Sequence, residues 1–184
     1  MAQYKFPTEV VDLPSKGKLY SKDSPLSKGE VELKYMTAKE EDILTSINLI
    51  RKGIVIDKVL ESLIVDKKVK IGDLLIGDKN ALMISARILG YGKDYNVKAS
   101  CSECGKSGDL KVDCTQLKDI EISDDIKENK FSMKLPTTKV EIEFKLLNSG
   151  EEMLVDKDVE AMKKVQPDVD YTNSFRFKKM ITSV

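Results

Sequence analysis

The sequence predicts an α+β fold, in which an antiparallel sheet is formed by strands near 30–36, 94–114 and 130–147 with helices packed on one side. Short stretches such as "EVELKYM" at 30–36 alternate apolar and charged residues, which is typical of strands with one buried face. Longer stretches such as "MTAKEEDILTSINLIRKG" at 36–53 combine helix-starting residues with apolar residues at helical spacing. With 184 residues, 41% hydrophobic and 34% charged, the chain can bury a core of ordinary size.

Residues 1–29 are predicted to form an extended N-terminal arm that precedes the α+β domain over 30–165. Pro7, Pro14 and Pro25 exclude a regular helix, and the Ser-Lys-Gly sequence is typical of turns. We expect this arm to be an extended or irregular segment that docks on a partner.

The helix that follows the strand at 30–36 has the clearest local signals. Thr37 and Glu40 have the spacing of a capping box, and Gly53 is a candidate left-handed stop. One apolar stripe is expected from Ile43, Ile47 and Ile50.

Two further helices are predicted before the cysteine segment. One starts near Asp57, and its inward residues are Val59, Leu60, Leu63 and Ile64. The other covers 79–89 and is closed by Gly90. This second helix is apolar nearly all round, so it is either buried in the core or packed against another chain.

The rest of the chain is predicted as two strand pairs, a helix and a tail. Residues 94–114 form a ribbon-like hairpin that protrudes from the fold, and a pair at 130–147 is broken at Pro136. A helix covers 150–165, with one side made of Met153, Leu154, Val159 and Met162. The tail at 166–184 shows no clear period but is apolar enough to dock.

Two segments share one layout. "LPSKGKLYSKDSPLSKGEVELKYMTAKEEDIL" at 13–44 and "LPTTKVEIEFKLLNSGEEML" at 135–154 both run from Leu-Pro through a strand and a cap into a helix that opens with Glu-Glu. A duplicated strand–helix unit is one interpretation. Chance is the other, because Leu-Pro turns before strands are common.

Charge and composition exclude several function classes. The 31 basic and 31 acidic residues cancel and are mixed along the chain, so no basic surface for nucleic acid is expected. The chain has no histidine, which excludes Ser–His and Cys–His nucleophile pairs and His-ligated zinc. No segment is apolar enough to span a membrane, and none resembles a signal peptide. We therefore expect a soluble, non-catalytic protein made in a cytosol.

The only three cysteines lie close together in sequence. Cys101 and Cys104 form a C-x-x-C knuckle followed by Gly, and Cys114 lies ten residues further on. One interpretation is a structural zinc site with all three cysteines, completed by Asp109, Asp113, water or another chain. The alternatives are a hairpin without metal, in which Cys114 is a core residue, and a redox pair, which the position between strands disfavours.

These motifs together resemble the baseplate hub assembly family of T4-like contractile-tailed phages. The resemblance covers most of residues 10–160, and its most specific parts are Leu13–Tyr20 and Met36–Leu44, with the "CSECG" knuckle as a looser match. It implies a non-catalytic late protein, made in the host bacterial cytoplasm, that helps to build the central hub of the baseplate as an assembly chaperone or minor hub component. It also implies hub and tape-measure proteins as partners and leaves residence in the virion tail open.

Candidate partner-binding residues come from the arm, the apolar helix and the tail. They are Leu13, Pro14, Tyr20, Leu82, Ile88, Phe175 and Phe177. Each has an alternative as a core residue, and contacts between copies in a homo-oligomer are another use of the same surfaces. The alternative function is a zinc-ribbon adaptor or regulator that binds another protein or nucleic acid.

Overall fold

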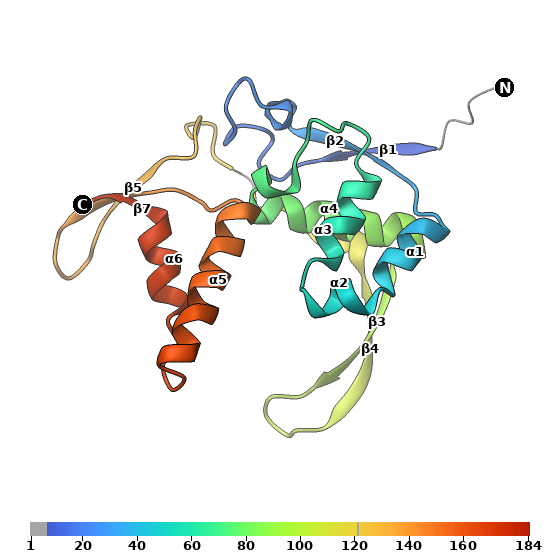
Figure 1. The fold of residues 1–184 in the computed structure, drawn as a ribbon. Helices are drawn as coiled ribbons and strands as arrows, with labels where there is room; N and C mark the ends of the chain where they lie inside the picture. The colour runs from blue at the N-terminus through green and yellow to red at the C-terminus, as the bar shows by residue number, and fades with distance from the viewer. Residues whose placement is uncertain (1–6, 121) are drawn as a thin grey trace.

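The structure is a computed structural model that describes residues 7–120 and 122–184. Figure 1 shows the elements in space. The helices are α1 (Ala38–Leu44), α2 (Ile47–Arg51), α3 (Val55–Leu63), α4 (Ile76–Tyr91), α5 (Ser149–Val165) and α6 (Thr172–Met180). The strands are β1 (Thr8–Asp12), β2 (Glu30–Lys34), β3 (Asp94–Ser100), β4 (Ser107–Asp113), β5 (Phe131–Lys134), β6 (Glu141–Phe144) and β7 (Ile181–Ser183). Short 3-10 helices are η1 (Pro25–Lys28), η2 (Ile71–Asp73) and η3 (Cys114–Gln116). The α+β class is confirmed.

The strands form three small antiparallel sheets, and the prediction of one continuous sheet is wrong. β1 pairs with β2, β3 pairs with β4, and β6 lies between β5 and β7. The physical reason is that chain segments following the helices pair with the outer edges of β2 and β6, so these edges are not open to a further strand. The N–H of Val65, just after α3, donates to the carbonyl of Glu32 in β2 at 3.0 Å, and β7 covers the open edge of β6.

The main core lies in the N-terminal part of the chain, where β1 and β2 pack with α1, α3 and α4. Its buried residues are Leu13, Leu26, Val31, Leu33, Val59, Leu60, Leu63, Ile64, Ile71, Leu74, Leu82 and Ala86. The predicted inward residues of the second helix are all in this core. Because helix 79–89 also contributes Leu82 and Ala86, it is a core helix with one partly open side.

The described part of the predicted N-terminal arm belongs to this core. Residues 13–29 form the connection of the β1–β2 hairpin, closed by the N–H of Leu13 donating to the carbonyl of Gly29 at 2.8 Å. Leu13, Leu19 and Leu26 are buried. Prolines and glycines correctly exclude an α-helix here, where the short 3-10 helix η1 forms instead, and the three leucines anchor the connection by burying apolar surface.

The predicted helix over 37–53 is broken into α1 and α2. The hydroxyl of Thr45 donates to the carbonyl of Glu41 at 3.0 Å, and Ser46 begins the next helix in extended conformation. The break divides the expected stripe: Ile43 packs against the main core, whereas Ile47 is 64% exposed and Ile50 is 52% exposed. Gly53 has φ +67°, as the predicted left-handed stop requires.

Gly90 does not end the third helix, which continues to Tyr91 and ends at Gly92 with φ +80°. A Cβ on Gly90 would lie 2.5 Å from the sulfur of Met36. The glycine therefore allows close packing between α4 and the segment before α1.

The C-terminal part of the chain has its own smaller core. Its buried residues are Leu147, Val155 and Val159, with Phe175 and Met180 packed against them. Helix α5 matches the predicted range, but Met153 and Leu154 are exposed because α6 packs on the other side of the helix. The predicted tail at 166–184, which has no periodic pattern of apolar residues, forms α6 and β7.

The structure supports the shared layout of the two segments. In the first, the β1–β2 hairpin leads into α1 and later α3, after which Ile64 returns antiparallel to Leu33 of β2. In the second, the β5–β6 hairpin leads into α5 and α6, after which β7 returns antiparallel to β6. Both units therefore run from a hairpin through helices to a segment that pairs back with the second strand. The first unit has three helices, α1 to α3, and returns through a single bridge, whereas the second has α5, α6 and the strand β7.

The two units join where η2 and α4 meet the start of α5. The N–H of Ser149 donates to the carbonyl of Leu74 at 2.7 Å, and Lys79 donates to the hydroxyl of Ser149 at 2.7 Å. A Cβ on Gly150 would lie 3.1 Å from the carbonyl oxygen of Gly72, so the backbones approach closely.

Candidate interaction surfaces

A buried carboxylate holds the connection of the β1–β2 hairpin against α4. Asp78 is 1% exposed and accepts hydrogen bonds from the N–H of Ser15 at 2.9 Å, the hydroxyl of Ser15 at 2.6 Å and the hydroxyl of Tyr20 at 2.6 Å. Tyr20 in turn accepts from the N–H of Leu75 at 2.9 Å. Burial and the hydrogen bond to Asp78 raise the pKa of Tyr20 well above its usual range, so the phenol stays a donor.

Two glycines let this connection fold back on itself. Gly17 has φ +73° and Gly29 has φ +77°. A Cβ on Gly17 would lie 2.3 Å from the carbonyl oxygen of Ser27, and one on Gly29 would lie 2.7 Å from the carbonyl carbon of Lys16. The Leu-Pro-Ser-x-Gly sequence therefore stabilises the fold of this connection. Its serine, Ser15, binds Asp78, and its glycine, Gly17, lies where a side chain would clash with the backbone.

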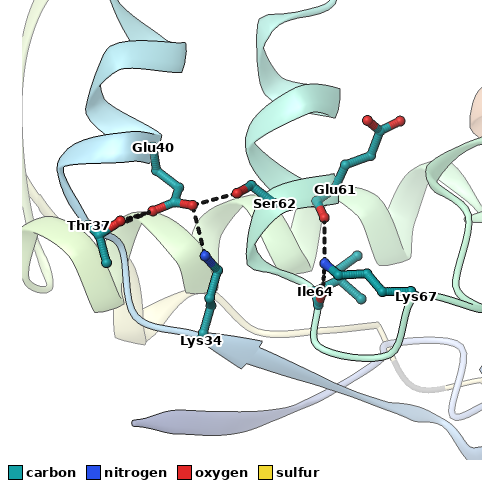
Figure 2. A network of polar contacts seen from close by, with 7 residues as sticks. All are labelled: Lys34, Thr37, Glu40, Glu61, Ser62, Ile64 and Lys67. Atoms are coloured by element: carbon teal, nitrogen blue, oxygen red, sulfur yellow. Dashed lines mark hydrogen bonds and ion pairs between the residues drawn. The ribbon is translucent and has the colours of Figure 1, made fainter. Parts of the chain in front are cut away.

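A second buried carboxylate joins β2, α1 and α3. Figure 2 shows Glu40 facing Thr37, Lys34 and Ser62. Glu40 accepts from the N–H of Thr37 at 2.9 Å, from its hydroxyl at 2.6 Å, from Lys34 at 3.0 Å and from the hydroxyl of Ser62 at 2.5 Å. Burial alone would raise the pKa of Glu40, but these hydrogen bonds outweigh it and lower the pKa to about 2. The capping interaction predicted for Thr37 and Glu40 is confirmed.

The same arrangement occurs at the start of α5. Glu151 accepts from the N–H of Asn148 at 3.2 Å and forms an ion pair with Lys145, and Asn148 accepts from the N–H of Glu151 at 2.8 Å. In each unit a lysine lies three residues before the capping residue and a glutamate three residues after it: Lys34, Thr37 and Glu40 in the first unit, and Lys145, Asn148 and Glu151 in the second. These networks fix each helix to the preceding strand.

An apolar groove of about 350 Å³ opens between α1, α3, α4 and the start of β3. It is lined by Met36, Leu44, Ile56, Val59, Leu60, Met83, Ile84, Ala86, Arg87, Tyr91 and Tyr95. The guanidinium of Arg87 lies 5.0 Å from the ring centre of Tyr91 and 5.4 Å from that of Tyr95. This cation–π pairing holds two half-exposed aromatic rings at one side of the groove.

Sequence patterns do not indicate this groove. Its nearest signal is the apolar character of helix 79–89 on every side, which left both burial and partner contact open. On this helix Leu82 is fully buried, whereas Met83 is 38% exposed in the groove, so partner contact stays a prediction. Tyr91 and Tyr95 have no periodic signal and are brought to the groove only by the end of α4 and the turn into β3.

The predicted partner-binding residues lie in different environments. Leu13 and Leu82 are buried in the main core, and Tyr20 is half-buried at Asp78. Pro14, Ile88 and Phe175 are half-buried. Phe177 is 57% exposed on α6, so it is the member of this set with the most accessible side chain.

The cysteines do not form a single cluster. Cys101 and Cys104 are exposed in the turn that joins β3 and β4, whereas Cys114 is buried where the hairpin joins the fold. Hydrogen bonding from the backbones of Cys104 and Glu103 and from the Cys104 thiol lowers the pKa of the Cys101 thiol. Within residues 7–120 and 122–184, no group of three or more Cys, Asp or Glu side chains is arranged to hold a metal ion.

The fold is an α+β scaffold that presents an apolar groove and several exposed apolar side chains. A family model described as T4 bacteriophage base plate protein matches residues 5–177. The chain therefore belongs to that family and has a structural role in the phage baseplate, located in the phage tail and in contact with other baseplate proteins. No curated protein and no solved structure matches it. In the described part of the chain, no helix has both the length and the apolar character needed to cross a membrane.

Proposed function

We propose that this protein assists assembly of the central hub of the baseplate, as an assembly chaperone or minor hub component, through contacts with hub or tape-measure proteins and without catalysis. Family membership supports the baseplate setting. The observation that carries the proposal further is the apolar groove between α1, α3 and α4. Exposed apolar surface of this kind, held on a rigid scaffold, is the usual form of a protein contact site.

The occupant we assign to the groove is an apolar helical segment of another baseplate protein. Met36 and Met83 line it, and methionine side chains adapt to a partner's shape. Tyr91 and Tyr95 supply large contact areas with little side-chain freedom to lose, because Arg87 already holds them. A groove walled by three helices suits a fourth helix that inserts apolar side chains at helical spacing.

Co-expression with tagged hub and tape-measure proteins, followed by pull-down, tests this proposal. Met83→Glu places a charge in the groove on an exposed side chain, and Val65→Glu is a matched control, since Val65 is similarly exposed but outside the groove. We expect the wild type and Val65→Glu to be captured and Met83→Glu to be captured at least about tenfold less. Capture of none of them, or equal capture of all three, contradicts the proposal. Thermal melts establish that both variants are folded.

A further inference from the structure

We propose that Cys101 and Cys104 are one half of a zinc site that two copies of this protein complete together at the tips of their β3–β4 hairpins. This inference goes beyond the hub-assembly role, because it assigns a metal and a self-contact that neither the fold class nor the family requires.

The turn between the strands already has the shape of a metal-binding knuckle. The N–H of Cys101 donates to the carbonyl of Lys106 at 2.9 Å, and the N–H of Gly105 donates to the carbonyl of Cys101 at 3.0 Å. Gly105 has φ +68°, a conformation that a side chain at this position would disfavour.

One chain supplies only half of a tetrahedral site. Structural zinc takes four ligands, usually thiolate or imidazole, and the chain has no histidine. Cys114 cannot join the pair, because seven paired positions of β3 and β4 lie between it and Cys101, which places them roughly 25 Å apart at about 3.3 Å per residue. It is also 8% exposed and lies next to the main fold.

A second copy supplies the missing half with no further sequence requirement. A twofold axis through the metal brings a second Cys101 and Cys104, and twofold dimers are the commonest protein oligomers. The turn carries both Glu103 and Lys106, so two turns that meet bring opposite charges together. Because the chain has zero formal net charge, long-range repulsion between copies is small. Zinc replaces the thiol protons, which pass to the solvent, and no electron transfer is involved.

The hairpin itself lacks other support at this end. In Figure 1 the β3–β4 hairpin extends away from the helices. Every residue from Lys98 to Lys111 is exposed. Two-stranded hairpins are marginally stable in water, and a metal shared at the tip holds the two strand ends together. The cysteines lie at the position where such a link acts on both hairpins.

The experiment uses the full chain, purified under reducing conditions and supplied with ZnCl₂, then freed of excess metal. Metal content by mass spectrometry and molar mass by light scattering should give about one zinc per two chains and a dimer that chelator dissociates. Co²⁺ in place of zinc should give the visible absorption of tetrahedral thiolate coordination. Cys101→Ser and Cys104→Ser should each abolish metal binding and dimer together, whereas Cys114→Ser should keep both.

Several results would overturn this inference. A metal-free protein under these conditions excludes the site. One zinc per monomer, or a dimer that survives Cys101→Ser and chelator, excludes the shared arrangement. Zinc bound only after a hub or tape-measure protein is added assigns the other two ligands to that protein. None of these outcomes affects the pull-down that tests the apolar groove, so the zinc proposal and the groove proposal can be refuted independently.

Discussion

Replacing Glu40 by glutamine removes the negative charge at the centre of the network that joins β2, α1 and α3. The carboxylate is fully buried and accepts four hydrogen bonds from three side chains and one backbone N–H. An amide of the same shape turns one acceptor oxygen into a donor that faces other donors. Lys34 also loses its ion pair with Glu40, which has an N–O distance of 3.0 Å.

The pKa of Glu40 gives the magnitude. Its pKa is lowered from an ordinary 4.5 to about 2, which corresponds to roughly 3 kcal/mol of unfolding free energy at about 1.4 kcal/mol per pH unit. Because the pKa is lowered in the folded state, this stability is fully present above pH 4.5 and is lost as the pH falls toward 2. We therefore expect Glu40→Gln to lose roughly 3 kcal/mol at pH 7 and less than half of that at pH 3.

Urea unfolding of wild type and variant at pH 7 and pH 3 measures this difference, since other titrating groups cancel between the two proteins. Glu61→Gln is the control, because Glu61 pairs with Lys58 at 2.6 Å on an exposed part of α3 and should lose under about 1 kcal/mol. A loss within about 1 kcal/mol for Glu40→Gln at pH 7, or the same loss at both pH values, would refute the reasoning.

Three further pairs of substitutions test the hairpin connection and the C-terminal core, each by urea unfolding at pH 7. Gly17→Ala should cost more than about 2 kcal/mol, because it combines φ +73° with a backbone clash, whereas Gly108→Ala meets nothing within 4 Å and should cost under about 1 kcal/mol. Asp78→Asn should cost roughly 2–4 kcal/mol and Tyr20→Phe roughly 1–2 kcal/mol; equal losses would contradict the central role of the carboxylate. Phe175→Ala should cost about 2 kcal/mol and the exposed Phe177→Ala under about 0.5 kcal/mol, and a reversed order would place the wrong face of α6 against α5.

Local patterns predicted the elements whose signals are local. The alternation in 30–36, the cap at Thr37 and Glu40, the inward face of α3 and the left-handed Gly53 all follow from interactions within a few residues. The ends of α5 follow in the same way, since Asn148 caps its start and Pro167 follows its last residue, Val165, by two positions. These features depend on backbone geometry and short-range hydrogen bonds, which are encoded at fixed spacings.

The candidate surfaces depended on contacts between distant residues. Spacing alone grouped Cys114 with Cys101 and Cys104, but β-pairing places the thiols at opposite ends of a ribbon. The groove combines residues from three helices and a strand, and no single window of sequence contains them.

Residue types alone decided the α+β class, the absence of imidazole chemistry and the position of the helix caps, because composition and short-range spacing suffice for each. Tertiary packing decided that the hairpin connection at 13–29 is core, that the strands divide into three sheets and that Met83, Tyr91 and Tyr95 share a groove. Burial of apolar surface favours the packing of distant segments whose shapes fit together, and that fit exists only in the folded chain.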